Sequence, residues 1–207
     1  AGRSEAGHVA AASHTGAIAG DDRLEVDALS RAGATIARSM KAFEAALSWL
    51  SRYPKVAAER PTVVSNAGFE TVCAADVIEL ATLDDEGGAR VAEVLARRRL
   101  DGLVAPRLPL DLTPMADLDA WLEVVRVLAP EAGTLVLGLV PFTPKLDRSR
   151  LPELVATLSA LPCPVAIVID AGPDGDWLRD PLVAAGCLVF SSMEEALAGL
   201  RSIGRAR

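Results

Sequence analysis

One histidine, His14, stands among small side chains in a way that suits phosphoryl chemistry. Ser13, Thr15 and Gly16 surround it, and such small neighbours leave an imidazole unshielded and let another backbone come close. A neutral imidazole is a good nucleophile near pH 7 when its other nitrogen donates to an acceptor that fixes the tautomer. His14 is therefore a candidate carrier of a phosphoryl group. The alternative, which residue type alone favours, is a solvated loop histidine.

The turn formed by Asn66, Ala67 and Gly68 is a second candidate site, because it ends an apolar stretch and begins a helical pattern. Such a turn exposes backbone N–H groups at the positive end of a helix, which suits an anionic oxygen cluster. Many turns of α/β proteins look the same and bind nothing, so the turn by itself is a weak signal. Glu70 lies in the first helical turn, where its charge suits the helix dipole but would repel a bound phosphate.

Two further segments are interpreted as structural. The segment 109–117 carries acidic and hydroxyl side chains near a turn and could line a cleft, but loop and helix-cap structure is the main interpretation. The turn 170–173 lacks the Glu that a calcium loop of this kind needs, so we interpret it as a solvated turn.

The composition excludes several classes of protein. The chain has 207 residues, of which 51% are hydrophobic and 24% charged, as in a globular protein of one large or two small domains. Its net charge of −7 argues against nucleic acid or an anionic membrane as the main partner. No apolar run reaches the roughly 20 residues of a membrane helix, and we see no secretory leader. Three dispersed cysteines beside apolar residues predict a reducing, cytoplasmic environment, and no Cys or His cluster suggests a metal site.

The N-terminal part of the chain carries two helical patterns. Residues 1–20 are so rich in small side chains that we expect a loop there. Apolar residues at helical spacing predict a helix from Asp21 and another from Ser39, with a short strand over 34–37 between them. The second helix is expected to bury the face formed by Phe43, Ala46, Leu47 and Leu50.

From about residue 61, apolar strands alternate with amphipathic helices. Strands are predicted over 62–65, 134–140, 164–169 and 187–190. Helices are predicted over 69–80, 86–99, 118–128, 150–161, 178–185 and 193–203. Continuous apolar strands between such helices indicate a parallel sheet covered on both faces. The sequence therefore predicts an α/β domain preceded by the tail end of another α/β domain.

Five segments together resemble a known family. Residues 2–7 and 11–20 resemble the phosphohistidine segment of NDP-forming acyl-CoA synthetases, which include ADP-forming acetyl-CoA synthetase and are relatives of succinyl-CoA synthetase. The likeness continues through 65–68, 74–76 and 109–114 and covers essentially the whole chain. The histidine segment is the specific part of the resemblance, and the other segments support it.

The resemblance implies a fold and an activity. The fold is a parallel-sheet, flavodoxin-like, three-layer α/β/α architecture of the succinyl-CoA synthetase kind. Residues 1–58 would be the C-terminal part of one such domain with the phosphohistidine loop, and residues 59–207 a second flavodoxin-like CoA-ligase domain. The implied activity is that of an acid–thiol ligase, which converts acyl-CoA, phosphate and ADP into free acid, CoA and ATP. The phosphoryl group would pass from an acyl phosphate to a loop histidine, which His14 matches, and then to ADP.

The resemblance also implies site residues, cofactors and partners. The phosphate would be held by residues near the histidine and by one helix N-terminus: Ser13, Thr15, Gly16, Asn66, Ala67 and Gly68. CoA, ATP or ADP and Mg²⁺ would be bound mainly by a CoA-binding Rossmann domain and an ATP-grasp domain or subunit that this chain lacks. Acyl-CoA would be the small-molecule substrate, and the assembly could be a homo- or hetero-oligomer. Residues 69–71 read Phe-Glu-Thr where the family commonly has Gly-Pro-Gly.

Two alternatives stay open. A non-catalytic binding or assembly module could use the same fold, since a fold does not fix function, and Glu70 could mark a lineage that lost phosphoryl transfer. The chain could also belong to an acyl- or carbamoyl-transferring relative that uses CoA or phosphate without an ATP-grasp partner. Phosphorylation of His14 by Mg-ATP would count against the first alternative, and an ATP-grasp segment beside this one would count against the second.

Overall fold

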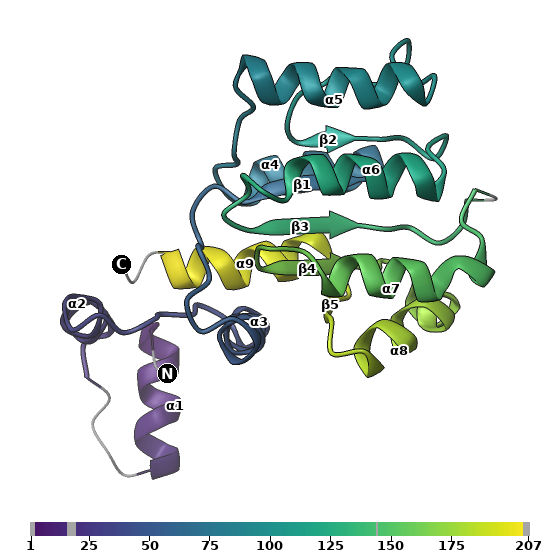
Figure 1. The fold of residues 1–207 in the computed structure, drawn as a ribbon. Coiled ribbons are helices and arrows are strands. Elements are labelled where there is room, and N and C mark those ends of the chain that lie inside the picture. Colours follow the sequence, from purple (N-terminus) through teal and green to yellow (C-terminus); the bar gives the residue numbers. More distant parts are fainter. Residues whose placement is uncertain (1–2, 16–19, 144, 205–207) are drawn as a thin grey trace.

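The structure is a computed structural model that describes residues 3–15, 20–143 and 145–204, with only the backbone described for His14 and Thr15. Within these residues lies a five-stranded parallel sheet, built in chain order from β1 (Thr62–Ser65), β2 (Leu110–Asp111), β3 (Leu135–Gly138), β4 (Val165–Val168) and β5 (Leu188–Phe190). The strands lie in the order β2-β1-β3-β4-β5, which is the flavodoxin-like order (Figure 1).

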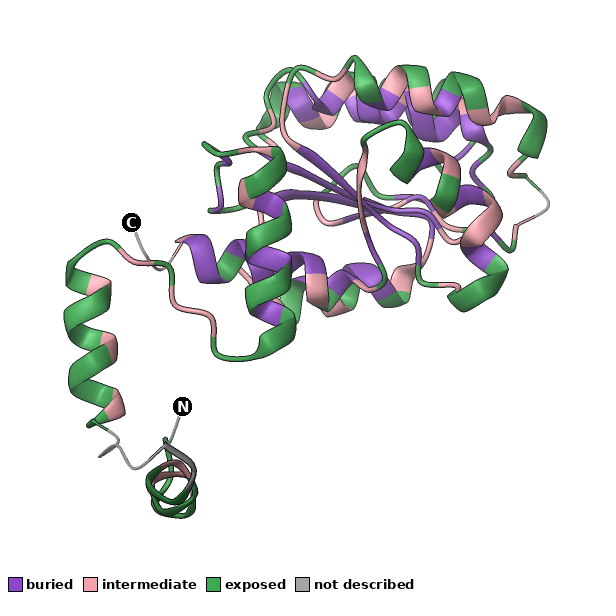
Figure 2. Cartoon of the chain, turned by 90° about the horizontal axis from the view of Figure 1, so that it is seen from below, coloured by how far each residue is buried: buried purple, intermediate pink, exposed green. Residues whose placement is uncertain are grey.

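Helices cover both faces of this sheet (Figure 2). One face carries α5 (Asp85–Arg97), α6 (Leu118–Leu128), α7 (Leu151–Ser159) and α8 (Asp176–Ala184). The other face carries α3 (Met40–Arg52), α4 (Gly68–Val77) and α9 (Met193–Gly204). Short 3-10 helices, Arg148–Arg150 and Gly172–Gly175, precede α7 and α8.

Strands β1, β3, β4 and β5 each contribute side chains to both helical layers, because side chains alternate along a strand. In β3, Leu135 and Leu137 pack against the first helical layer, whereas Val136 packs against the second. This double burial explains why the sequence of β3 is apolar without alternation. The predicted parallel α/β fold with three layers is confirmed.

Helix α3 is fixed to α9 on one face of the sheet. The Trp49 side chain is completely buried, and its ring N–H donates to the carbonyl oxygen of Ala196 at 2.9 Å. Gly199 permits the close crossing, because a Cβ there would lie 2.8 Å from the backbone of Ala45. Thus α3, which falls inside the predicted first unit of residues 1–58, packs on the sheet of the second.

The predicted inner face of this helix is partly wrong. The buried residues of α3 are Ala42, Ala45, Ala46 and Trp49. Phe43 and Leu47, which were expected to face inward, are about half exposed. The small alanine side chains face α9 because they allow the two helices to approach closely, and this brings the larger neighbours to the surface.

The N-terminal residues form helices that lie apart from the sheet. The expectation of a loop over 1–20 is wrong for the described part, where Glu5–Thr15 form α1, because this stretch is rich in alanine, the strongest helix former. Helix α2 (Asp22–Arg31) is capped by Asp21, whose carboxylate accepts two backbone N–H groups. Both helices lie beyond α3, on the side where the strands begin (Figures 1 and 2).

Two other local predictions differ from the structure. Residues 34–37 form an irregular connection and not a strand, since no described strand lies beside them to pair with. Strand β2 was not predicted from the sequence, because a strand of two residues is too short to show a periodic pattern. It pairs with β1 through Val64 and Leu110 and through Ser65 and Asp111. Among the described helices, none is long and apolar enough to cross a lipid bilayer.

Candidate functional site

The turn after β1 lies at the point of the sheet where ligands commonly bind in flavodoxin-like folds. Strands β1 and β3 are neighbours, and Ser65 and Gly138, their last residues, are partners in register. The chain leaves β1 for α4 on one face and leaves β3 for α7 on the other, so a crevice opens between the two carboxyl ends. The predicted turn of residues 66–68 is therefore at a topological switch point.

The Asn66 side chain fastens this turn to the segment after β3. Its Oδ1 accepts the backbone N–H of Val140 at 2.8 Å, and its Nδ2 donates to the carbonyl oxygen of the same residue at 3.0 Å. The residue is buried. The Asn66 side chain thus binds the fold through its oxygen and through one of the two N–H groups of Nδ2.

Ser65 organises the first turn of α4. Its hydroxyl accepts the N–H of Ala67 at 2.9 Å and donates to Oε2 of Glu70 at 2.5 Å. The N–H of Ala67, one of the predicted phosphate donors, is thus already paired. In the described residues the free donors of this turn are the N–H groups of Gly68 and Phe69, as expected at a helix start.

Glu70 is the unusual group at this site. Its side chain is 1% exposed, and its second oxygen, Oε1, has no hydrogen-bond partner among the described residues. Burial is the main cause that raises the pKa of Glu70 to about 7; the Ser65 hydroxyl opposes this rise, and the negative charges of Asp170 and Glu194 contribute to it. The carboxyl is therefore neutral in a substantial fraction of molecules at neutral pH.

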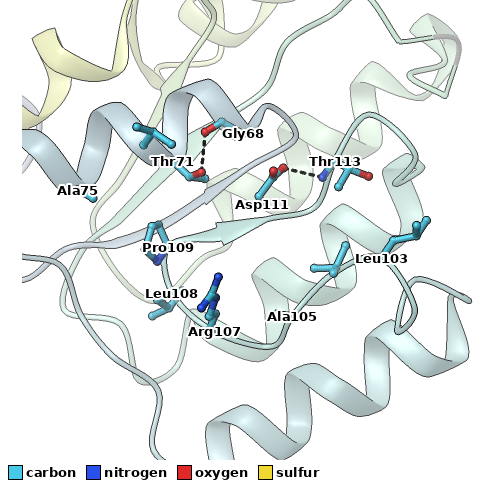
Figure 3. A pocket seen from close by; sticks show the side chains of 12 residues that line it. Gly68, Thr71, Ala75, Leu103, Ala105, Arg107, Leu108, Pro109, Asp111 and Thr113 are labelled. Atoms are coloured by element: carbon cyan, nitrogen blue, oxygen red, sulfur yellow. Dashed lines mark hydrogen bonds between the residues drawn. The ribbon is translucent and has the colours of Figure 1, made fainter.

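A cleft of about 660 Å³ opens beside the turn, between α4, β2 and the segment before β2 (Figure 3). Asp111 reaches across its floor, because its Oδ2 lies 2.7 Å from where a Cβ on Gly68 would stand. Its other oxygen accepts the N–H of Thr113 at 2.8 Å. Arg107 contributes a cation and Thr71 a hydroxyl that donates to the carbonyl of Gly68. The segment 109–117 thus lines a cleft, and it also caps a helix, since Asp117 accepts the N–H of Ala120.

The structure does not bring the two predicted parts of the site together. His14 and Thr15 lie in the last turn of α1, with their side chains outside the described part, and Gly16 is outside it altogether. Ser13 is exposed, and its hydroxyl donates to the carbonyl of Ala10. Helix α1 lies on the side where the strands begin, whereas the turn 66–68 lies where β1 ends (Figure 1).

The described residues offer little other reactive chemistry. All three cysteines are free thiols, and burial raises the pKa of Cys163 and Cys187. No group of three or more His, Cys, Asp or Glu in the described part is arranged to hold a metal ion. Sequence reasoning missed the burial of Glu70 and the role of Asn66, because the first depends on Gly138 in β3 and the second on Val140 after it, both far away in the chain.

Comparisons with known proteins agree with the resemblance in the sequence. Residues 1–50 match the family model described as a succinyl-CoA ligase like flavodoxin domain. The chain is 29% identical, over 98% of its length, to the α subunit of acetate–CoA ligase [ADP-forming] I from Pyrococcus furiosus. It is 28% identical, over 76% of its length, to 4-hydroxybutyrate–CoA ligase [ADP-forming] from Nitrosopumilus maritimus. It covers 45% of the first relative and 23% of the second.

A solved structure shows the same fold. It is the dinucleotide forming acetyl-coenzyme A synthetase 1 of Ca. Korarchaeum cryptofilum, determined with phosphate and ADP. The TM-score is 0.83 at 23% identity, and the match covers 100% of this chain and 46% of that one. The comparisons thus confirm the resemblance found in the sequence: this chain is similar along nearly its whole length to an ADP-forming acyl-CoA synthetase subunit, and its first 50 residues match the model of a succinyl-CoA ligase like flavodoxin domain.

Proposed function

We propose that this chain is the phosphohistidine-bearing region of an ADP-forming acyl-CoA synthetase, in which His14 carries the phosphoryl group. The observation that carries the proposal is the similarity to an ADP-forming α subunit over 98% of the chain, which includes both the histidine segment and the turn after β1. The chain spans less than half of the relatives it matches, so further parts would complete the reaction.

In the synthesis of ATP, the unprotonated ring nitrogen of His14 attacks the phosphorus of an acyl phosphate. A P–N bond forms, the P–O bond to the acyl group breaks, and the free acid leaves as a carboxylate. The terminal phosphate oxygen of ADP then attacks the phosphohistidine, and the P–N bond breaks to regenerate the imidazole. The second ring nitrogen keeps its proton throughout, so a fixed tautomer is needed.

The turn after β1 would hold the phosphoryl group at one stage of this cycle. The free N–H groups of Gly68 and Phe69 point out of the first turn of α4, where the helix dipole favours an anion. The hydrogen bonds of Asn66 to Val140 and of Ser65 to Ala67 hold this turn in place before a phosphoryl group binds. Little further ordering of the backbone is therefore needed on binding. Because α1 lies away from the turn, the transfer requires movement of the His14 segment relative to the sheet.

CoA, ATP or ADP, and Mg²⁺ would be held outside the described residues of this chain. The relatives' names state ADP formation and CoA ligation, and both activities require sites that a CoA-binding Rossmann domain and an ATP-grasp domain or subunit would supply. The division into residues 1–58 and 59–207 belongs to the same proposal, with α3 bridging to the second part.

The decisive experiment is phosphoryl labelling of the full enzyme that contains this chain. Incubation with Mg-ATP labelled on its γ-phosphate should place an acid-labile, base-stable label on His14, and unlabelled ADP should remove it. The variants His14→Ala and His14→Asn should lose the label, whereas His8→Asn, the matched control, should keep it. A label that persists without His14 contradicts the proposal.

A non-catalytic module on the same fold is a second candidate, which the buried carboxyl of Glu70 at the α4 turn favours. It predicts that the wild-type protein takes no label and that Glu70→Gly gains it. Labelling with Glu70 in place excludes this candidate.

A further inference from the structure

Glu70 fills a space between the ends of β1 and β3 that the neighbouring residues leave open for it. A Cβ on Gly138 would lie 1.8 Å from Oε2 of Glu70 and 2.5 Å from the hydroxyl of Ser65. Only glycine at this position therefore accommodates the carboxyl. Ser65, Glu70 and Gly138 come from β1, α4 and β3 and form one packed unit, which we call the carboxyl seat.

The carboxyl seat is connected directly to the donors of the α4 turn. Glu70 receives the Ser65 hydroxyl, and the same hydroxyl receives the N–H of Ala67, the residue before Gly68. The backbone N–H of Glu70 itself donates to the carbonyl of Ala67 at 3.0 Å. The position of the first turn of α4 therefore depends on the Glu70 carboxyl through two hydrogen bonds, one from the Ser65 hydroxyl to Glu70 and one from the N–H of Ala67 to the Ser65 hydroxyl.

The charged groups around the carboxyl seat are acidic. Asp170 follows β4 and Glu194 lies at the start of α9, and both disfavour a charge on Glu70. From β2, Asp111 lies against Gly68 at the other side of the turn. On α4 itself, Cys73 interacts electrostatically with Glu70, and burial and Glu194 raise the pKa of the Cys73 thiol. Among the described residues, the charges that act on the Glu70 carboxyl are those of Asp170 and Glu194, and both are negative.

We propose that Glu70 is a positioning residue for the anion site of α4, which binds its anion while Glu70 is neutral and releases it when Glu70 ionises. The inference rests on the proposed function, because it assumes that the α4 turn receives a phosphoryl group. The neutral carboxyl holds Ser65, and through it the turn, without adding charge. The ionised carboxyl places a negative charge in a low-dielectric space under the donors of Gly68 and Phe69, where it repels the anion.

Sulfate is the probe for this site, because it keeps two negative charges over the whole range in which Glu70 titrates. The experiment follows the backbone amide resonances of Gly68 and Phe69 in the 207-residue chain during sulfate titrations from pH 5.5 to 8.5. In the wild type, sulfate affinity should fall about tenfold between pH 6 and pH 8, as expected for one added charge a few ångströms away. The side-chain ¹³C resonance of Glu70 should titrate with the same midpoint.

Two variants separate positioning from simple structural support. Glu70→Gln keeps an acceptor for Ser65 but cannot ionise, so its sulfate affinity should stay at the acidic level of the wild type at every pH. Glu93→Gln, an exposed substitution on α5 at the opposite face of the sheet, should keep the wild-type profile. If Glu70→Gln fails to fold, agreement between the two wild-type midpoints still decides the question.

The possible failures point to different conclusions. If sulfate shifts the two amides equally at all pH values while Glu70 titrates, or if Glu70→Gln keeps the wild-type pH profile, the inference is wrong and the anion site stands. If sulfate shifts neither amide at any pH in either protein, the α4 turn does not bind anions. That result would contradict the proposal that the α4 turn holds the phosphoryl group. Phosphoryl labelling of His14 would still test separately whether His14 carries it.

Discussion

The N-terminal arm (residues 3–15 and 20–39) and the body (residues 40–143 and 145–204) of this chain are built on different principles. In the arm, α2 has no buried residue, and Leu24 is 71% exposed. Its order comes from local contacts such as the Asp21 cap and the Arg31–Asp27 ion pair. In the body, the strand side chains are almost all buried between two helical layers.

This difference shows that the proposed phosphoryl carrier, His14, and the packed core lie in separate parts of the chain. The arm carries His14 and contributes little to the packed core, so it can move without a large loss of packing. The body carries the α4 turn, which Ser65 and Asn66 hold in place. The proposed phosphoryl transfer requires a carrier on a loosely packed segment and a firmly held turn at the carboxyl end of β1.

The largest expected effect lies in the body. Trp49→Ala should lower the free energy of unfolding by about 3–5 kcal/mol, because it empties a fully buried site and removes the bond to Ala196. Denaturant unfolding followed by circular dichroism measures the change. A loss below about 1 kcal/mol would show that α3 is as loosely held as the arm and would break the comparison.

The second effect concerns the ionisation of Glu70 and its dependence on pH. Since its pKa is raised from 4.5 to about 7, the folded protein binds the proton more tightly than the unfolded chain. The free energy of unfolding of the wild type should therefore fall between about pH 4.5 and pH 7, by about 3 kcal/mol from this group. Glu70→Gln should lose this fall, so its stability relative to wild type should increase from pH 4 to pH 8. Parallel pH profiles for the two proteins would contradict the prediction.

A third effect tests the fit of the carboxyl seat. Gly138→Ala should destabilise the body by about 1–3 kcal/mol, since the new methyl group would overlap Glu70 and Ser65. The double variant with Glu70→Ala should recover part of that loss, because the methyl group then has room. A double-mutant cycle in urea measures the coupling, and strictly additive effects would show that the two positions are independent.

The smallest effect is expected in the arm. Leu24→Ala should change the free energy of unfolding of the body by less than about 0.5 kcal/mol, because the side chain is exposed and packs on no described core. The same denaturant experiment applies. A loss comparable to that of Trp49→Ala would mean that the arm is part of the body's cooperative unit.

Sequence patterns predicted the elements whose signal is local and long enough to repeat. Helix α6 was predicted with the bounds that the structure shows, and β1, β3 and β4 followed from their apolar runs. The loop over 1–20 failed, because small residues suit both a loop and an alanine-rich helix. Strand β2 was missed, because two residues carry no period.

By itself the sequence determined the layered parallel architecture, the candidate status of His14 and the likeness to ADP-forming synthetases, since all three depend on residue types and short spacings. Only the tertiary structure decided that Asn66 is used to clamp Val140, 74 positions away, and that Glu70 is buried against Gly138. The physical reason is that burial and electrostatic fields come from neighbours in space, which the sheet brings together from distant parts of the chain.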